Sequence, residues 1–569
     1  LFGVEYVDQE EAYQSDAPWD FFQDSWYIYP GGCENQVTAP YDGTPQGGCY
    51  PVGSSRIPAS RLGFINQGTF LIDDAQAATQ PYEVGIMVPH DGRTYNYAPV
   101  NYIQTPYERV NLFATASMDL GNEITLSGEI RGNTRTSAQE LAPMPYNSPT
   151  DPAYSGVFNG TAYNGISEDN YYLRRAVDAY NAANPTATPL VYEPVRDARR
   201  RMIETTRRFT QDITQIQANA TLAGTFGEVD WEVYYNKGYR TRTDVDFGQF
   251  FGPNLSNAMG PSADLNNDGQ PECYQDVNDP SSIITGCVPF NFFGGGIVNA
   301  AGIPTLTTVT QDMIDYVGIN LVDTFQTDLD QGGLAFTGSM FELPGGAMGW
   351  AAGYEYRKEQ FTYEPDSAKQ KDEVTGNTGA GTTGQYSVDS LYVEFFAPFF
   401  DNGSQALNLT LGARYDDFST FGDNTTWQAG LEFSVFEDLK LRATAGEVFR
   451  APGIGELFGG QVDSFPTYND PCDPSNNVSG VIAPGCAQAT TQLDTQVLAR
   501  VGGNPFLDPE EGDTITMGVV WTPTFGDHDI SVTLDYWKTE LEGLITNLGV
   551  QYILNDCYED QNPNSCALV

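Results

Sequence analysis

Apolar and polar residues alternate with a period of two along many segments of the chain. Between residues 406 and 415, leucine and alanine occupy every second position, and Asn, Thr, Gly and Arg fill the positions between them. Because successive side chains of a β-strand point to opposite faces, such a segment predicts a strand with one apolar and one polar face. The apolar rows lie within residues 110–118, 229–235, 407–413, 427–435, 439–445, 515–521 and 530–536.

The lengths of the connections discriminate between two architectures for these strands. A two-sheet sandwich turns its apolar faces inward, whereas a membrane barrel turns them outward to lipid. Short turns are predicted near 121–122, 227–228, 344–346, 437–438 and 525–527, and they alternate with long connections at 143–205, 251–318, 366–382 and 451–511. One compact connection around 416–425 is the exception. We therefore predict an all-β fold, a transmembrane antiparallel up-and-down β-barrel with short periplasmic turns and long extracellular loops.

The composition excludes several classes of protein. Among 569 residues there are 75 Asp and Glu but only 27 Lys and Arg, and this formal charge of −48 excludes a general nucleic-acid binder. The 33 Tyr and 32 Phe exclude a disordered acidic tail. The sequence contains no apolar run of about 18 residues, so we do not expect a transmembrane helix. Leu1 is not followed by a recognisable signal peptide. We expect the acidic excess to form a solvated face; recruitment of divalent cations or of a cationic ligand is the alternative.

Eight cysteines fall into four close pairs in hydrophilic, turn-rich stretches. We predict four loop disulfides, and the alternative is eight reduced thiols. The predicted bonds are Cys33–Cys49, Cys273–Cys287, Cys472–Cys486 and Cys557–Cys566. No pair has CxxC spacing and no histidine lies nearby, so zinc is not expected. Disulfides indicate the periplasm, the cell surface or secretion.

The segment DLNNDGQPE resembles a calcium-binding loop. Its oxygen-bearing side chains recur at the spacing that Ca²⁺ loops use, and a glycine follows at the sixth position. The predicted ligands are Asp264, Asn266, Asp268 and the carbonyl of Gln270, with Glu272 or Asp276 completing the shell. The twelfth position is Gln275 rather than Glu, which departs from the EF-hand pattern. An ordinary Asx/Gly turn with solvated acids is the alternative.

Two further features lie in the predicted loop 143–205. Residues 167–185 predict a helix that packs within the loop, with Ser167 as its N-cap and Pro185 as its stop. A basic cluster follows, and it is predicted either to clamp a phosphate or carboxylate or to balance nearby acids. The cluster consists of Arg196, Arg199, Arg200, Arg201, Arg207 and Arg208. The chain has no GxSxG, Walker A or HExxH motif, so we do not expect an enzyme.

Several blocks of sequence resemble the TonB-dependent outer-membrane receptors. FRAPGIGELFGG at 449–460 is similar to that family's FRAP…ELF signature, and NPFLDPEEGDTITMGVVWTP at 504–523 to its Asn-Pro-x-Leu-x-Pro-Glu segment. Weaker similarities lie at 95–120, 207–226, 534–545 and 553–558. The resemblance implies energy-coupled uptake of a scarce nutrient, such as a siderophore, cobalamin, carbohydrate or peptide. The nutrient would bind at the outer loops, a plug would gate its passage, and the inner-membrane TonB complex would supply energy.

The resemblance also sets expectations for the rest of the receptor. The family's barrel has about 22 strands, whereas this chain has about 12 to 14 by the same pattern, opens on a strand and shows no plug. We therefore expect residues 1–569 to be one partial outer-membrane barrel domain of a longer protein from a Gram-negative bacterium. Outer-membrane lipid and lipopolysaccharide would surround the barrel. The alternatives are a passive porin-like or surface-adhesive barrel and a secreted Ca²⁺-dependent β-protein.

Charged residues on the polar faces of the strands are expected to point into the barrel. There they would hold the plug or line the path of the nutrient. They are Glu129, Arg131, Asp230, Glu232, Arg414, Glu432, Lys440, Arg442 and Asp535.

Overall fold

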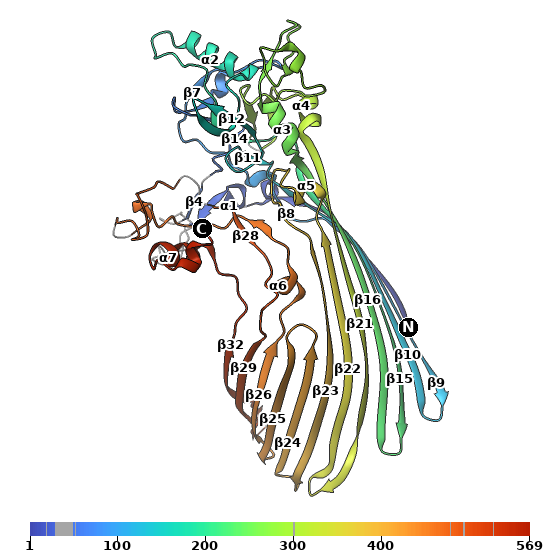
Figure 1. Ribbon diagram of the computed structural model, residues 1–569. Helices are drawn as coiled ribbons and strands as arrows, with labels where there is room; N and C mark the ends of the chain where they lie inside the picture. The colour runs from blue at the N-terminus through green and yellow to red at the C-terminus, as the bar shows by residue number, and fades with distance from the viewer. Residues whose placement is uncertain are drawn as a thin grey trace.

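One large antiparallel sheet forms the body of the molecule. The computed structural model describes residues 1–18, 20–28, 49–51, 53–299, 302–477, 480–492, 496–526 and 528–569. The sheet has 13 strands and curves into a wall (Figure 1). In sheet order the strands are β1 (Phe2–Gln9), β9 (Tyr107–Gly121), β10 (Ile124–Leu141), β15 (Arg207–Phe226), β16 (Val229–Phe250), β21 (Gly318–Leu343), β22 (Gly346–Glu364), β23 (Thr382–Asp401), β24 (Ala406–Phe418), β25 (Gly422–Phe436), β26 (Leu439–Arg450), β29 (Glu510–Trp521) and β32 (Val532–Glu542). The predicted all-β barrel fold is confirmed, and the total of about 22 strands stays a prediction.

Short and long connections alternate around the sheet as the sequence predicts. The long ones at 142–206, 251–317, 365–381 and 451–509 gather at one end, and the hairpin turns lie at the other (Figure 1). The compact connection at 419–421 is also confirmed. A further short turn at 402–405, between β23 and β24, was not predicted, although its Asn402-Gly403 dipeptide is a turn signal.

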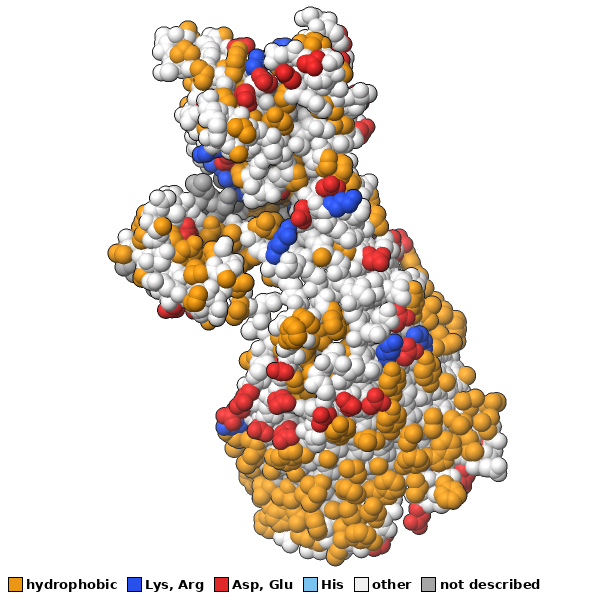
Figure 2. All heavy atoms as spheres, in the orientation of Figure 1, with side chains coloured by type: hydrophobic (Ala, Val, Ile, Leu, Met, Phe, Trp, Pro, Cys, Tyr) orange, Lys and Arg blue, Asp and Glu red, His pale blue; other side chains and the backbone are white. Residues whose placement is uncertain are grey.

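The apolar rows lie exposed on the outward face of the sheet. The register places Leu409, Leu431, Ala443 and Met517 side by side on four adjacent strands. Leu431 is 44% exposed and Met517 49% exposed, so neither lies in a two-sheet core. Apolar side chains cover the lower half of the wall in Figure 2. Such a band is what an outer-membrane barrel presents to lipid.

Three long connections fold together into a globular unit that the sequence pattern did not predict. We define the loop domain as the described residues of 53–106, 142–206 and 251–317. Its sheet has the order β11 (Pro145–Asn147), β14 (Val195–Arg201), β5 (Arg61–Phe64), β6 (Thr69–Ile72) and β7 (Met87–Pro89). Helices α2 (Tyr171–Ala183), α3 (Gly252–Met259) and α4 (Gln311–Val317) belong to the same domain. Leu62, Tyr146, Tyr172 and Phe292 lie in one shared core, with each connection contributing to it.

The remaining elements are short. They are β2 (Ala12–Tyr13), α1 (Asp20–Gln23), β3 (Trp26–Ile28), β4 (Cys49–Pro51), β8 (Tyr102–Gln104), β12 (Tyr154–Phe158), β13 (Thr161–Gly165), β17 (Ser262–Ala263), β18 (Glu272–Cys273), β19 (Gly296–Val298), β20 (Pro304–Thr307), α5 (Ser367–Gln370), α6 (Ile454–Phe458), β27 (Val462–Ser464), β28 (Ala499–Val501), β30 (Thr524–Phe525), β31 (His528–Asp529), α7 (Val550–Tyr558) and α8 (Pro563–Cys566). Within the described ranges, each helix is too short or too polar to cross a membrane.

The helix predicted at 167–185 is α2, but its N-terminus is three residues later than expected. Asn170, not Ser167, is the N-cap, and its Oδ1 accepts hydrogen bonds from the amides of Tyr172 and Leu173 at 3.1 and 3.3 Å. The Ser167 hydroxyl instead accepts a hydrogen bond from the amide of Asp169, which closes a turn before the helix. The helix ends before Pro185, as predicted, because proline cannot continue the hydrogen-bond ladder.

Three of the four predicted disulfides are present. They join Cys273 to Cys287, Cys472 to Cys486, and Cys557 to Cys566. Cys33 lies outside the described residues, so the Cys33–Cys49 pair stays a prediction. The last two disulfides belong to segments that pack together, because the amide of Gly485 donates a hydrogen bond to the carbonyl of Tyr558 at 2.7 Å.

We expect the four pairs to survive as separate local crosslinks in the oxidised protein. Each bond closes a short loop, so exchange between pairs would require long-range rearrangement. Mass spectrometry of non-reduced proteolytic peptides will detect each predicted pair, including Cys33–Cys49. Crosslinked peptides that join different pairs, or free thiols, would contradict this pairing.

Candidate functional site

The predicted inward-facing charges lie on the face opposite to the apolar rows. The register joins Glu432 of β25 to Arg442 of β26 and Gly518 of β29 to Asp535 of β32, all on this inner face. Arg442 Nη2 lies 2.8 Å from Asp535 Oδ1, and Lys440 Nζ lies 3.3 Å from Glu432 Oε2. Arg131 also pairs with Glu129. Their predicted role in holding a plug or lining a path stays a prediction.

Side-chain amides, which the sequence analysis did not single out, connect the inner wall across several strands. Gln217 Nε2 donates to Asn236 Oδ1 at 3.0 Å, and Asn236 Nδ2 donates to Gln331 Oε1 at 3.3 Å. Gln331 Nε2 then donates to Glu355 Oε2 at 3.1 Å, and Arg414 lies 3.6 Å from the same carboxylate. The row crosses β15, β16, β21, β22 and β24. Its only signal in the sequence is a polar residue at every second position.

An aromatic and charged surface covers the inner wall near the outer ends of β16, β21 and β22. The rings of Phe325 and Tyr363 stack with centroids 4.5 Å apart, and the guanidinium of Arg242 lies 4.4 Å from the Phe325 centroid. Arg242 Nε donates to Asp244 Oδ1 at 2.7 Å. We call Arg242, Asp244, Phe325 and Tyr363 the mouth surface. Stacked rings beside a partly exposed guanidinium can hold a planar group, and the buried Asp244 carboxylate fixes that guanidinium in place.

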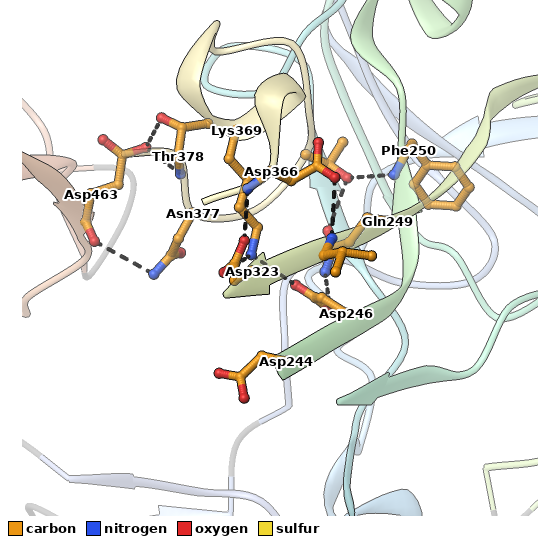
Figure 3. Close-up of polar contacts among 12 residues, drawn as sticks. Asp244, Asp246, Gln249, Phe250, Asp323, Asp366, Lys369, Asn377, Thr378 and Asp463 are labelled. Carbon is orange, nitrogen blue, oxygen red and sulfur yellow. Dashed lines mark hydrogen bonds and ion pairs between the residues drawn. The ribbon is translucent and has the colours of Figure 1, made fainter. Parts of the chain in front are cut away.

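Residues 365–381, which we call the strap, fasten this region to two other loops. Lys369 Nζ lies 2.8 Å from Asp323 Oδ2 and 4.0 Å from Asp246 Oδ2, on β21 and β16 (Figure 3). Asp323 lies directly opposite Asp244 in the sheet register. Because two carboxylates stand on adjacent strands, the Lys369 ammonium and Arg242 are needed to offset their repulsion.

The strap also reaches the loop domain and the 451–509 connection. The amide of Phe250 donates to the Thr375 hydroxyl at 2.9 Å, and the amide of Gly252 donates to the carbonyl of Glu373 at 2.7 Å. At its other end, the Thr378 hydroxyl donates to Asp463 Oδ2 at 2.7 Å (Figure 3). The strap therefore couples the loop domain to the loop that carries the Cys472–Cys486 disulfide.

Replacing Lys369 with methionine will loosen the strap. The substitution leaves the nearly buried Asp323 without its cation, at a cost of about 1.5–3 kcal/mol. Hydrogen–deuterium exchange will become faster in residues 365–381 and 460–465 but not in the turns at the opposite end of the barrel. Lys371→Met, at an exposed position of the same segment, is the matched control. Equal exchange in the two variants would contradict the role of Lys369.

Three of the six arginines in the predicted basic cluster do not form the anion clamp that was one hypothesis. Arg199, Arg200 and Arg201 are buried in the loop domain. Arg199 Nε donates to Asp197 at 2.6 Å, and Arg201 Nη1 donates to the carbonyl of Pro143 at 2.7 Å. Burial lowers the pKa of Arg201 to about 10. The alternative, charge balance against nearby acids, is correct for Arg199 and for Arg200, which pairs with Glu204, whereas Arg201 is held by a neutral carbonyl.

The predicted calcium loop adopts a compact turn between β17 and β18. Asp264 accepts hydrogen bonds from the amides of Asp268 and Gly269 at 3.1 and 2.9 Å, and Asn266 Oδ1 accepts one from the Asp268 amide at 3.0 Å. Glu272 instead accepts from the Tyr274 hydroxyl at 2.7 Å, and Asp276 from the amide of Asn278 at 2.8 Å. In the described part of the chain, no three His, Cys, Asp or Glu side chains form a group that could hold a metal ion.

Calcium binding at this loop stays a prediction. If it occurs, the affinity should be weak, on the order of millimolar, as for extracellular calcium modules. Terbium luminescence or calcium calorimetry on the wild type and on Asp264→Asn will measure it, and Asp312→Asn in α4 is the control. Binding that is unchanged by Asp264→Asn would place the cation elsewhere.

The comparisons with known proteins identify the family. The family model for the TonB-dependent receptor-like β-barrel matches residues 90–565, and the chain belongs to this family. Members of the family are outer-membrane proteins of Gram-negative bacteria, and the exposed apolar band fits that location. The alternative of a secreted Ca²⁺-dependent β-protein is therefore wrong. The family consists of receptors and transporters rather than enzymes.

The solved structures that resemble the chain are distant. A mutant of the ferric enterobactin receptor PfeA from Pseudomonas aeruginosa is 14% identical with a TM-score of 0.38, and the match covers 83% of this chain and 45% of that one. The siderophore receptor PirA from Acinetobacter baumannii is 12% identical with a TM-score of 0.34, covering 87% and 55%. The RagAB peptide importer is 11% identical with a TM-score of 0.37, covering 76% and 40%. The chain spans about half the length of these proteins.

Proposed function

We propose that this chain is the barrel portion of an outer-membrane TonB-dependent receptor that takes up a scarce nutrient by energy-coupled transport. The observation that carries the proposal is the family match over residues 90–565. The nutrient is a siderophore, cobalamin, carbohydrate or peptide. A plug domain outside this chain gates its passage, the inner-membrane TonB complex supplies the energy, and residues 1–569 act as a transporter without enzymatic activity.

The inner wall suits the passage of a polar solute. A row of side-chain amides and ion pairs runs across the inner wall from Gln217 on β15 to Arg414 on β24. Water and a hydrated ligand therefore meet hydrogen-bonding groups along this wall. The mouth surface offers aromatic faces near the outer end, where a ligand arrives first. We infer that this surface makes early contact with the nutrient, because base-like, phenolic or sugar rings stack on such rings.

The outer connections are built to hold a fixed shape. The loop domain has its own core, and the strap fastens it to the 451–509 connection through Thr378 and Asp463. A receptor that selects a scarce ligand needs such preorganised contacts, because rigid groups lose less entropy on binding. A freely open porin has no such requirement.

Uptake measurements will test the proposal. Cells that carry the full-length gene should accumulate a radiolabelled nutrient, and deletion of the TonB gene or addition of a protonophore should abolish accumulation. Arg242→Ala at the mouth surface should weaken ligand binding, and because the same guanidinium pairs with Asp244, binding is compared per folded barrel, as measured by heat-modifiable gel mobility. TonB-independent entry of many small solutes would overturn the proposal in favour of a porin-like barrel.

A further inference from the structure

Six aromatic side chains line the inner face of the sheet at the end where the long connections gather. The register places five of them on β21 to β24, on the same face as Arg242 and Arg414. The sixth lies in the connection at 419–421. This face is the polar one, so contact with lipid does not account for the rings. We call these six side chains the aromatic arc: Phe325, Phe361, Tyr363, Tyr386, Phe418 and Phe421.

The rings of the arc form two groups on neighbouring strands. In the first group, Phe325 of β21 stacks on Tyr363 of β22 with ring centroids 4.5 Å apart. In the second, the Phe418 centroid lies 6.1 Å from that of Tyr386 and 4.7 Å from that of Phe421. Phe418 is buried, and the other rings of the arc are partly exposed. From β21 to β24 the arc spans about 14 Å at the usual strand spacing, which is longer than one six-membered ring.

The cations beside the arc already have partners. The guanidinium of Arg242 lies 4.4 Å from one ring centroid of the arc and pairs with Asp244. The guanidinium of Arg357 lies 6.0 Å from another ring centroid, and its Nε lies 3.4 Å from Glu359 Oε1. A ferric catecholate, or the carboxylate of a peptide, would have to compete with these carboxylates for each cation. The arc therefore suits a ligand without negative charge.

Hydrogen-bonding groups accompany the rings. Glu359 is partly exposed and can accept a hydrogen bond from a hydroxyl, and the partly exposed guanidinium of Arg242 can donate one. Deeper in the barrel, Gln331 stands on the same face of β21 as Phe325, six residues or about 20 Å away. Its side chain belongs to the row of hydrogen-bonded amides that crosses the inner wall. A ligand that leaves the arc therefore meets further groups that bind hydroxyls.

We propose that the nutrient is an uncharged oligosaccharide and that its sugar rings stack along the aromatic arc. This inference rests on the proposed function and selects one of its four nutrient classes. The apolar faces of the sugars pack on the aromatic rings, and their hydroxyls meet Arg242, Glu359 and the amides deeper in the wall. A chain fits better than one sugar, because the arc is longer than a single ring. Cobalamin offers one large macrocycle, which matches a single flat platform rather than two groups of rings.

Calorimetry on the purified full-length protein in detergent will test the ligand class. The probes are maltohexaose, cellohexaose, xylohexaose and laminarihexaose, with hexagalacturonate as the charged counterpart and cyanocobalamin as the macrocycle. At least one neutral hexasaccharide should bind, about tenfold more tightly than its own monosaccharide and than hexagalacturonate. Binding of none of the four, or equally tight binding of hexagalacturonate or cyanocobalamin, would overturn the proposal.

Variants of the arc separate ring stacking from apolar bulk. Phe325→Ala and Phe421→Leu should each weaken binding of that hexasaccharide about three- to tenfold, because each removes one stacking partner. Phe421→Tyr keeps a ring and should bind like the wild type. Phe336→Ala is the matched control, since Phe336 lies on the same strand as Phe325 but is 41% exposed on the outward face. Equal binding by Phe421→Leu and Phe421→Tyr would overturn the role of stacking.

The binding assay does not depend on energy coupling, so the two proposals can fail separately. Heat-modifiable gel mobility will show that each variant is folded, and binding is compared per folded barrel. Energy-coupled uptake of another solute, with no hexasaccharide bound, would overturn this inference and leave the proposed function in place. Hexasaccharide binding with TonB-independent entry would support the ligand class and overturn the proposed function.

Discussion

Replacing Arg200 with methionine will destabilise the loop domain by about 3–5 kcal/mol, the usual cost of removing one partner of a buried ion pair. The Arg200 side chain is 0% exposed and that of Glu204 5% exposed. Two guanidinium nitrogens of Arg200 donate to the two carboxylate oxygens of Glu204, both at 2.7 Å. Methionine fills a similar volume but leaves the Glu204 charge buried without its cation, with the Thr307 hydroxyl and a backbone amide as remaining donors.

The matched control is the double variant Arg200→Met, Glu204→Gln. It removes both charges, so much of the loss should be recovered. Hydrogen–deuterium exchange of peptides from 53–106, 142–206 and 251–317 will report the opening free energy. Because these three connections share one core, exchange should rise in all three together. An increase confined to 195–206 would contradict a common core.

The same pair makes the loop domain sensitive to acid. Burial by itself would raise the pKa of Glu204, but Arg200 and the hydrogen bond from Thr307 outweigh it and hold the pKa below its usual value. A carboxyl with a lowered pKa stabilises the folded state above its unfolded pKa. That contribution disappears as the pH falls through the folded pKa. The wild-type domain should therefore lose stability in strong acid, and the double variant should lose less.

Replacing Leu431 with arginine will destabilise the membrane-inserted barrel by about 2–4 kcal/mol if the residue lies near the bilayer midplane. Leu431 stands between Leu409 and Ala443 on the outward face, so the guanidinium would face lipid. Gln428→Arg is the control, because position 428 is on the same strand with its side chain on the inner face. Denaturant unfolding in lipid vesicles will measure both variants. A larger loss for Gln428→Arg would reverse the assignment of the two faces.

The sequence by itself determined the strands, their two faces and the alternation of short and long connections. These features are local: a strand repeats every two residues, and a turn is marked by its own Gly, Pro, Asn and Asp. The predicted connection 143–205 agrees with strands that end at Leu141 and resume at Arg207. Local spacing was also enough for three disulfides, because each joins cysteines 9 or 14 residues apart.

Only the tertiary structure decided which loop residues are buried and which charges meet. Arg196 and Arg200 belong to one basic run, yet the first is exposed and the second is fully buried in the loop domain. Lys369 and Asp323 are 46 residues apart, and Glu447 and Asp513 are joined only by the sheet register. Such pairs depend on which strands become neighbours and on how three connections pack. That outcome is set by burial summed over distant segments, which no local pattern contains.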